Sequence, residues 1–171
     1  RQIKMRAVRL NVPQDKLYVL AENDVESILE KCEGMQPDVL IIDSIQTMVS
    51  EDSGSAPGSV SQVRQSAGAI VRYATASGTA TFIVGHVTKD GTLAGPRLLE
   101  HLVDTVISLE GDRREMFRML RVLKNRFGPN QELLIFRMVQ KGLEIVEDPS
   151  TFFLGARDTA LSGTAVVMAV D

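Results

Sequence analysis

The apolar residues of this chain gather in short runs that alternate with longer amphipathic stretches. The clearest run is Val39–Ile42, four branched apolar residues that follow Pro37 and precede Asp43. Such a run is typical of a parallel strand that is buried on both faces between helices. Thr79–Gly85 (TATFIVG) predicts a second buried strand, and Leu17–Leu20 predicts a short one.

The stretch between Leu20 and Pro37 has the spacing of an amphipathic helix. Asn23 is the expected N-cap, Glu26 three residues later completes a capping-box pattern, and Gly34 closes the helix. Its apolar positions recur at helical spacing and comprise Val25, Ile28, Leu29 and Cys32. Residues 1–10 predict the end of a further helix.

A longer helix follows the first buried strand. Ser50 to Gly58 is rich in serine, glycine and acidic residues, which predicts a loop. Ser59 and Gln62 then form a second capping box, and the helix ends near Gly78. Its apolar stripe comprises Val60, Val63, Ala67, Ile70, Val71 and Ala74.

Beyond Glu110 the alternation of strand and helix changes to short strands joined by turns. Thr105–Leu109 is a strand, and Met116–Leu123, Glu132–Met138 and Leu143–Ile145 follow it. Connections this short make the strands antiparallel neighbours. The predicted fold class is therefore α/β, with a mostly parallel sheet flanked by helices and a C-terminal antiparallel meander.

Composition narrows the class of protein further. The 171 residues are 44% apolar and 24% charged, as in ordinary globular proteins, and the net charge of −3 provides no overall basic field for nucleic acid. The single cysteine, Cys32, excludes an internal disulfide. A single cysteine fits a reducing cytoplasm, no apolar run reaches membrane-spanning length, and we expect no signal peptide and a cytoplasmic location. The chain ends look cut from a longer polypeptide.

Polar residues stand where the predicted parallel strands end. Asp43 and Ser44 follow the first buried strand, His86 follows the second, and a loop follows Leu123. Open α/β sheets bind ligands at this edge. Burying the charge of an aspartate costs free energy unless a partner, most often a cation, compensates it. Asp43 could equally cap the loop that follows the strand. A strand that ends in Asp-Ser, followed one helix later by a strand that ends in Gly-His, resembles the Walker B and sensor strands of RecA-like ATPases.

Several short motifs narrow this resemblance. Lys124-Asn125-Arg126-Phe127-Gly128 is similar to the characteristic motif of the RadA (Sms) family of bacterial DNA repair proteins. Further runs look like that family too: Met5-Arg6-Ala7, Asp43-Ser44-Ile45-Gln46, Pro57-Gly58-Ser59-Val60, Gly85-His86-Val87-Thr88-Lys89-Asp90-Gly91 and Leu93-Ala94-Gly95-Pro96. The resemblance covers residues 1 to about 170.

The resemblance implies a fold and an activity. RadA proteins resemble hexameric RecA-type motors, which use ATP with Mg²⁺ to promote branch migration of recombination intermediates. Implied partners are single-stranded DNA, branched recombination intermediates, the RecA recombinase and further subunits of a hexameric ring. The family also has an N-terminal zinc finger and a C-terminal domain similar to Lon protease. Residues 1–148 would then be part of the RecA-like core, and residues 149–171 a linker with the first strand of the Lon-like domain, at Thr164–Val170.

Some parts of the family pattern do not occur in this sequence. The four cysteines of the zinc finger are absent, so zinc is expected only in the N-terminal domain that this chain lacks. No Gly-x-x-x-x-Gly-Lys-Ser/Thr phosphate loop occurs, and the catalytic glutamate would lie before Arg1. We therefore expect the isolated chain not to hydrolyse ATP.

The resemblance also implies roles for individual residues. Asp43 would hold the Mg²⁺ shell, usually through water, with Ser44 assisting by a hydrogen bond, and His86 would sense the γ-phosphate. Each of these two residues also has a purely structural alternative. Ser44 could be an ordinary hydroxyl at the end of a strand, and His86 could be a loop histidine that is hydrogen-bonded to the backbone. Lys124 and Arg126 would reach the γ-phosphate of the nucleotide bound to the neighbouring subunit, with Arg126 as an arginine finger. If the surrounding motif were absent, we would interpret both residues as solvated surface cations.

Two loops occupy the positions of the DNA-facing loops of RecA-like proteins. They span residues 50–58 and 86–97, and Lys89 and Arg97 are the candidate phosphate contacts. The acidic residues Glu51, Asp52 and Asp90 weaken that assignment.

Two other classes of function remain open at this point. Ser44, His86 and several aspartates would suit a serine hydrolase, although no Gly-x-Ser-x-Gly elbow is present. Without a phosphate loop, the chain could also be a non-enzymatic module that binds neighbouring protomers or DNA. In RecA-like sheets a further strand separates Thr79–Gly85 from Thr105–Leu109, so a RecA-like placement predicts no direct ladder between these two.

Overall fold

The computed structural model describes residues 2–13, 15–50, 56, 58–86, 99–111, 117–130 and 132–148. The chain divides into two compact units, one of residues 1–108 with 121–132 and the other of residues 109–120 with 133–171. No helix in the described stretches is long and apolar enough to cross a membrane. The domain boundary predicted after residue 148, and the strand predicted at Thr164–Val170, lie outside the described residues.

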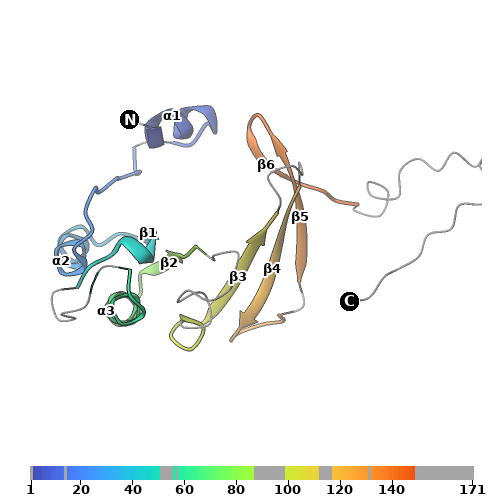
Figure 1. Ribbon diagram of the computed structural model, residues 1–171. Helices are drawn as coiled ribbons and strands as arrows, with labels where there is room; N and C mark the ends of the chain where they lie inside the picture. Colours follow the sequence, from blue (N-terminus) through green and yellow to red (C-terminus); the bar gives the residue numbers. More distant parts are fainter. Residues whose placement is uncertain are drawn as a thin grey trace, which may run out of the picture. The chain divides into compact units, whose positions relative to one another are not determined.

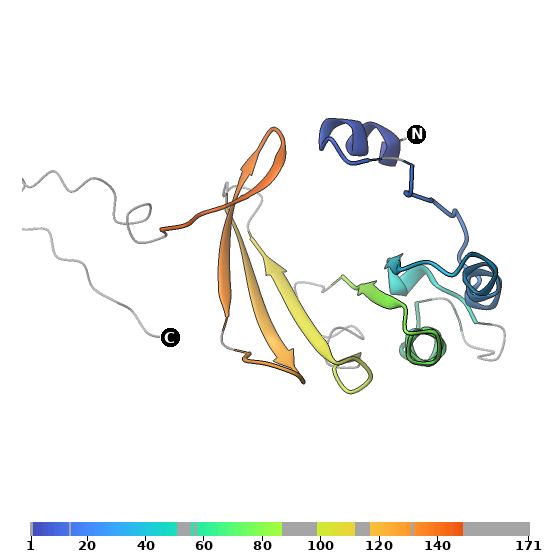
Figure 2. The ribbon, with the colours of Figure 1, turned by 180° about the vertical axis from the view of Figure 1, so that it is seen from behind.

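The first unit contains a parallel strand–helix–strand arrangement (Figures 1 and 2). β1 (Val39–Asp43) and β2 (Ala80–Val84) pair in parallel, and α3 (Val60–Ser77) lies between them in the chain. α2 (Val25–Met35) precedes β1, and a single 3-10 turn, η1 (Ile45–Thr47), follows it. The two buried-strand predictions and both helix predictions are confirmed as elements.

The core of this unit lies between the two helices and one face of the strands. Apolar side chains from α2, β1, η1 and α3 meet there, as the helical spacing predicts. The cluster comprises Val25, Ile28, Cys32, Ile42, Ile45, Met48, Val63, Ala67 and Ile70. Burial raises the pKa of the Cys32 thiol, which therefore remains protonated at neutral pH and behaves as a small apolar group.

The other face of β1 and β2 is exposed, which corrects the prediction of strands buried on both faces. Ile41 is 63% exposed and its register partner Phe82 is 58% exposed, and Val39 lies on the same face. Both α2 and α3 contribute to the core on the opposite face. No described helix or strand covers the outer face, so its apolar side chains remain accessible.

α2 begins one residue later than predicted. Asp24 is the N-cap, and its carboxylate accepts a hydrogen bond from the Ser27 amide at 2.8 Å. Glu22, rather than Glu26, accepts hydrogen bonds from the amides of Asn23 and Asp24. The capping box predicted at Asn23 is therefore wrong, because Asp24 is the cap and Glu22 accepts the hydrogen bond of the Asn23 amide that Glu26 was expected to accept.

The ends of α3 follow the prediction, whereas the end of α2 does not. Ser59 caps α3 by accepting a hydrogen bond from the Gln62 amide, and Gly78 ends the helix with a φ of 72°. α2 continues through Gly34 to Met35, and the C-cap residue Gln36 has a φ of 49°. The left-handed residue that closes α2 is therefore a glutamine, although glycine adopts this conformation at lower cost.

The Asp24 cap makes the stability of the protein depend on pH. The hydrogen bonds from Ser27 lower the pKa of Asp24 in the folded state. Because the pKa of Asp24 is lower in the folded state than in the unfolded state, its carboxylate stabilises the fold at any pH above its unfolded-state pKa of about 3.9. This stabilisation is lost as the pH falls through the pKa of Asp24 in the folded state. We expect the unfolding midpoint of Asp24→Asn, which keeps the cap, to fall less steeply below about pH 4 than that of the unsubstituted protein. Parallel slopes in thermal melts would show that Asp24 does not contribute to this pH dependence.

The antiparallel meander is confirmed. β3 (Thr105–Glu110), β4 (Phe117–Asn125), β5 (Leu133–Val139) and β6 (Gly142–Ile145) form a four-stranded sheet in that order. β5 and β6 are antiparallel neighbours joined by a turn of two residues. β3 belongs to this sheet and β2 to the two-stranded one, so no direct ladder joins them.

Two predictions near the N-terminus have different outcomes. The helix predicted within residues 1–10 is present as α1 (Gln2–Arg9). Leu17–Leu20 form no strand, and Tyr18 is 68% exposed. A strand needs a neighbour for its amides and carbonyls, and no described strand pairs with this segment.

Candidate functional site

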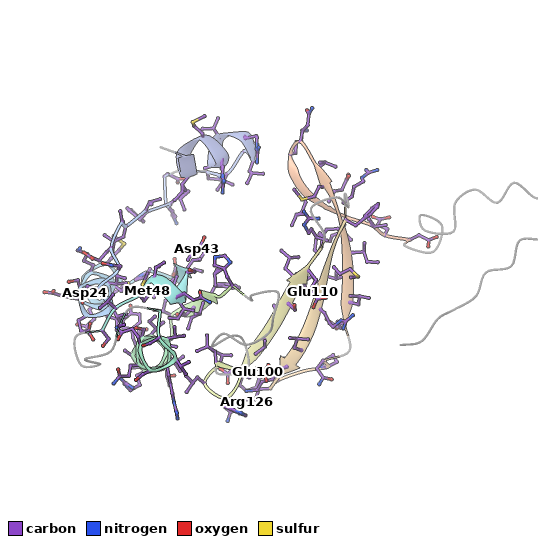
Figure 3. The ribbon with its side chains drawn as sticks, in the orientation of Figure 1. Asp24, Asp43, Met48, Glu100, Glu110 and Arg126 are labelled. Atoms are coloured by element: carbon purple, nitrogen blue, oxygen red, sulfur yellow. The ribbon has the colours of Figure 1, made fainter. Side chains whose placement is uncertain are left out.

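The carboxyl ends of β1 and β2 bring Asp43 and His86 to one edge of the parallel sheet. The register pairs Asp43 with Val84, and His86 follows two residues later. The Asp43 side chain projects from the end of β1 (Figure 3) and is exposed. The expectation of a buried carboxylate that requires compensation is therefore wrong, because water solvates the charge at the strand end.

The surroundings of Asp43 also argue against the loop-capping alternative. Ser44 is the N-cap residue of η1, and its own side chain makes no capping hydrogen bond. No hydrogen bond or ion pair joins the Asp43 carboxylate to any residue that the structure describes. Neither carboxylate oxygen is therefore engaged by the part of the chain that the structure describes.

The donor set at this edge fits Mg²⁺ held through water. Mg²⁺ usually keeps several waters and binds through one or two carboxylates together with phosphate oxygens. Asp43 supplies one unengaged carboxylate, and no cluster of three or more metal-ligating side chains occurs among the described residues. A single described carboxylate suits an ion that arrives with a phosphate ligand.

Ser44 contributes mainly through its backbone. It is buried, and its carbonyl accepts hydrogen bonds from the amide and the hydroxyl of Thr47. These bonds close the turn that follows β1. No hydrogen bond joins Ser44 to His86 among the described residues, so the pair does not form the nucleophile–base contact of a serine hydrolase.

Gln46 connects the two strand ends, a role that we did not predict from the sequence. Its Nε2 donates a hydrogen bond to the backbone carbonyl of His86 at 3.0 Å. Its Oε1 is buried and has no partner among the described residues. The only sequence signal was the place of Gln46 in the run Asp43–Gln46, since its partner lies 40 positions further along the chain.

Lys124 lies at the end of β4 and binds backbone carbonyls of its own chain. Its Nζ donates hydrogen bonds to the carbonyls of Glu100 and Val103, at 2.6 and 2.7 Å. Leu99 and Leu102 from the same segment pack against the core of the first unit. Lys124 is half-buried and thus fastens residues 99–103 to β4, whereas the sequence predicted an outward-facing cation. Its contact with a neighbouring subunit stays a prediction.

Asn125 shapes the turn after β4. Its Oδ1 accepts a hydrogen bond from the Phe127 amide at 3.3 Å, and its Nδ2 donates one to the Pro129 carbonyl at 3.2 Å. A Cβ atom at Gly128 would lie only 2.9 Å from that Nδ2. A side chain at position 128 would therefore push the Asn125 amide away from its bond to Pro129, which gives a physical reason for glycine at this position.

Arg126 is exposed at the start of this turn (Figure 3). Its Nη1 lies 3.2 Å from the Asp104 carboxylate, and its amide donates a hydrogen bond to the Asp104 carbonyl at 3.0 Å. The guanidinium also lies 5.7 Å from the centroid of the Phe127 ring, a cation–π contact. These contacts place Arg126 on the surface, and no hydrogen bond links it to Asp43 or His86 in the described part of the chain.

The candidate DNA contacts are not tested by the structure. Lys89 and Arg97 lie outside the described residues, as do most of the two loops at 50–58 and 86–97. Their assignment stays a prediction.

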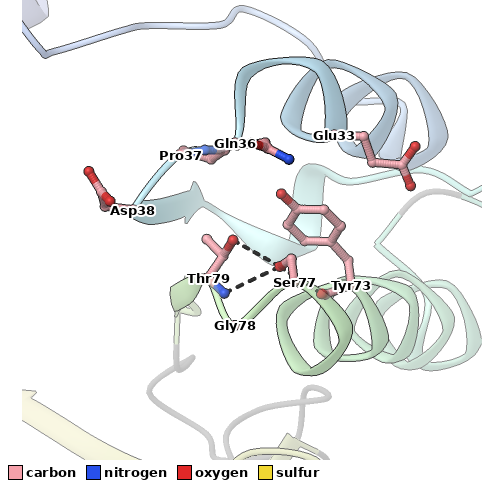
Figure 4. Close-up of a pocket in the computed structure, with 8 residues that line it drawn as sticks. All are labelled: Glu33, Gln36, Pro37, Asp38, Tyr73, Ser77, Gly78 and Thr79. Carbon is pink, nitrogen blue, oxygen red and sulfur yellow. Dashed lines mark hydrogen bonds between the residues drawn. The ribbon is translucent and has the colours of Figure 1, made fainter.

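A pocket of about 520 Å³ lies at the opposite edge of the parallel sheet (Figure 4). It includes Asp38 and Thr79, the residues that immediately precede β1 and β2. The Ser77 hydroxyl bonds to the hydroxyl and the amide of Thr79 at its wall. Ligands of open α/β sheets bind outside the carboxyl ends of the strands, so this pocket is not the candidate nucleotide site.

Open α/β sheets bind ligands at the carboxyl edge, which is where this parallel unit places Asp43 and His86. Residues 10–150 match the family described as "ATPase: KaiC", and the chain belongs to this family. A solved KaiC-like protein from Pyrococcus horikoshii OT3 has the same fold, with a TM-score of 0.62 at 14% identity over 85% of this chain and 70% of that one. A second solved ATPase domain has a TM-score of 0.57 at 13% identity, over 73% of this chain and 52% of that one. The predicted RecA-like fold class is confirmed.

Curated relatives narrow the similarity to one group. The DNA repair protein RadA of Pseudomonas aeruginosa is 52% identical over 97% of this chain. The RadA proteins of Halalkalibacterium halodurans and Bacillus subtilis are 48% and 46% identical over 100% of it. The resemblance to RadA is therefore confirmed. The chain spans 37% of the length of each of these three relatives.

Proposed function

We propose that this chain is the later part of the ATP-driven motor of a DNA repair protein of the RadA type. The observation that carries the proposal is Asp43, an exposed carboxylate with no described partner at the carboxyl edge of a KaiC-family ATPase sheet. In the whole protein, ATP hydrolysis would be coupled to single-stranded DNA and would drive branch migration of recombination intermediates. The RecA recombinase and further subunits, in a hexameric ring, are the proposed protein partners.

Residues at the carboxyl edge of the sheet would act on the bound phosphates, either directly or by holding their neighbours in place. Mg²⁺, when bound, neutralises charge that develops on the β- and γ-phosphates. Asp43 would orient the metal's water ligands, and Ser44 would keep the turn after β1 closed. His86 would contact the γ-phosphate, while the Gln46 bond to its carbonyl keeps its backbone beside the end of β1.

The proposed motor needs contributions from outside this edge. Lys124 and Arg126 would act on nucleotide bound to the neighbouring subunit. Lys89 and Arg97 would contact DNA phosphates, and residues 149–171 would lead into a Lon-like domain. The phosphate loop would come from an earlier part of the whole protein, along with the zinc finger.

Asp43→Ala is expected to abolish ATP turnover in a full-length RadA that carries these 171 residues, because the water shell of the metal would lose the carboxylate that orients it. Steady-state turnover, measured with and without single-stranded DNA, checks this. Asp38→Ala is the matched control, since Asp38 is exposed at the opposite end of the same strand. The isolated chain should show no turnover. Turnover by the isolated chain that disappears in Asp43→Ala would contradict the proposal that other parts are required.

One observation favours a second candidate function. The exposed apolar face formed by Val39, Ile41 and Phe82 would suit a non-enzymatic module that binds another protein segment. Nucleotide titration of the full-length protein separates the two, because a pure interaction module would bind neither ATP nor ADP.

A further inference from the structure

Arg126 is held at two points by a single residue. Its backbone amide bonds to the carbonyl of Asp104, and its guanidinium bonds through Nη1 to the carboxylate of the same residue. The hydrogen bond of the backbone amide fixes where the side chain starts, and the ion pair favours one position of the guanidinium at its end. Among the described residues, Nε and Nη2 of Arg126 have no hydrogen-bond partner.

Asp104 is itself well anchored. It follows the segment whose carbonyls at Glu100 and Val103 bind Lys124. Leu102 of that segment packs against the core. The carboxylate therefore projects from backbone that is fastened both to β4 and to the core, so it is a fixed reference point for the arginine.

The ion pair can orient Arg126 without locking it in place. Its side chains are 69% and 56% exposed, and exposed ion pairs contribute little to stability because water and salt screen them. A guanidinium carries five N–H donors in a rigid plane, and the pair uses only one edge of that plane. The other donors remain available to a phosphate that approaches from outside.

We propose that Asp104 is the positioning residue of Arg126, holding one edge of the guanidinium so that the other edge faces the phosphates of a nucleotide bound to a neighbouring subunit. This inference rests on the proposed role of Arg126 as an arginine finger. A flexible arginine on a surface turn would otherwise sample many rotamers, and only a few of them would reach the reacting phosphate. Positioning in advance removes that search from the barrier.

The test compares Asp104→Ala with Asp104→Asn in a full-length RadA that carries this sequence. Alanine removes the acceptor, so kcat for ATP should fall by about ten- to a hundredfold, as is usual for a misplaced group, with KM nearly unchanged. Asparagine keeps an oxygen in the same place, so its kcat should stay within about threefold of the unsubstituted protein. Glu144→Ala is the matched control, because it breaks the exposed Arg137–Glu144 pair elsewhere in the chain and should leave kcat unchanged.

A double substitution separates this inference from the proposed function. If Asp104 acts through Arg126, Asp104→Ala should cause no further loss in the Arg126→Ala background. Two results would overturn the positioning role and leave the role of Arg126 as an arginine finger intact. In the first, Arg126→Ala is slow while Asp104→Ala hydrolyses ATP normally. In the second, Asp104→Asn is as slow as Asp104→Ala. If Arg126→Ala hydrolyses ATP normally, the finger itself is refuted, and the positioning role with it.

Discussion

Arg126→Ala is expected to lower ATP turnover by a full-length RadA carrying this sequence on the order of a thousandfold, because an arginine finger stabilises transition-state charge on the transferred phosphoryl group. Binding of nucleotide to a single subunit should change little, since Arg126 would act across the subunit interface. Its side chain is 69% exposed and makes one surface ion pair, so the substitution should leave the fold intact. Turnover and equilibrium nucleotide binding, measured side by side, check this.

A mixing experiment tests whether Arg126 acts across the interface. Arg126→Ala subunits keep their nucleotide site, and subunits without the phosphate-loop lysine keep their arginine. Rings that contain both should recover turnover at interfaces where an intact site meets an intact finger. If the mixture recovers nothing and Arg126→Ala subunits fail to bind nucleotide by themselves, the assignment in trans is wrong.

Apolar spacing was sufficient to predict the elements that lie on both sides of the core. The periodic positions of α2 and α3 and the runs at β1 and β2 correspond to buried contacts, as with Ile28, Ile42 and Ile70. The spacing did not reveal that the outer face of β1 is exposed at Ile41, because a run of branched residues looks the same whether one or both faces are covered. Burial depends on neighbouring elements, and a strand's own sequence does not report them.

Polar contacts were harder to foresee than apolar ones. The short motif around Arg126 pointed to this turn as a candidate site, yet Asp104, the ion-pair partner of Arg126, lies 22 positions earlier with no motif of its own. Gln46 and His86 are likewise distant in sequence and adjacent in structure. At the start of α2, Glu22 and Asp24 outcompeted the predicted cap, since several carboxylates near a helix start can satisfy the same amides. Such pairings depend on strand register and local rotamers, which residue types alone do not specify.

Lys124 should behave differently from Arg126, although the two lie in one motif. Lys124→Met keeps the aliphatic stem and removes the ammonium, which leaves the carbonyls of Glu100 and Val103 without their donor. Hydrogen bonds to a charged group contribute about 1.5–3 kcal/mol, so local opening of residues 99–104 should become roughly ten- to a hundredfold more frequent. ATP turnover should fall as well, because Asp104 and hence Arg126 would lose their fixed support.

Hydrogen exchange measured by mass spectrometry resolves the two roles of Lys124. Peptides that cover the Leu102 and Val103 amides, both of which bond to the Leu99 carbonyl, should exchange faster in Lys124→Met. They should be unchanged in Arg126→Ala and in Lys141→Met, a control at an exposed lysine in the β5–β6 turn. Unchanged exchange in Lys124→Met, together with lost turnover, would mean that the carbonyl contacts are dispensable. Lys124 would then act on the neighbouring subunit's nucleotide alone.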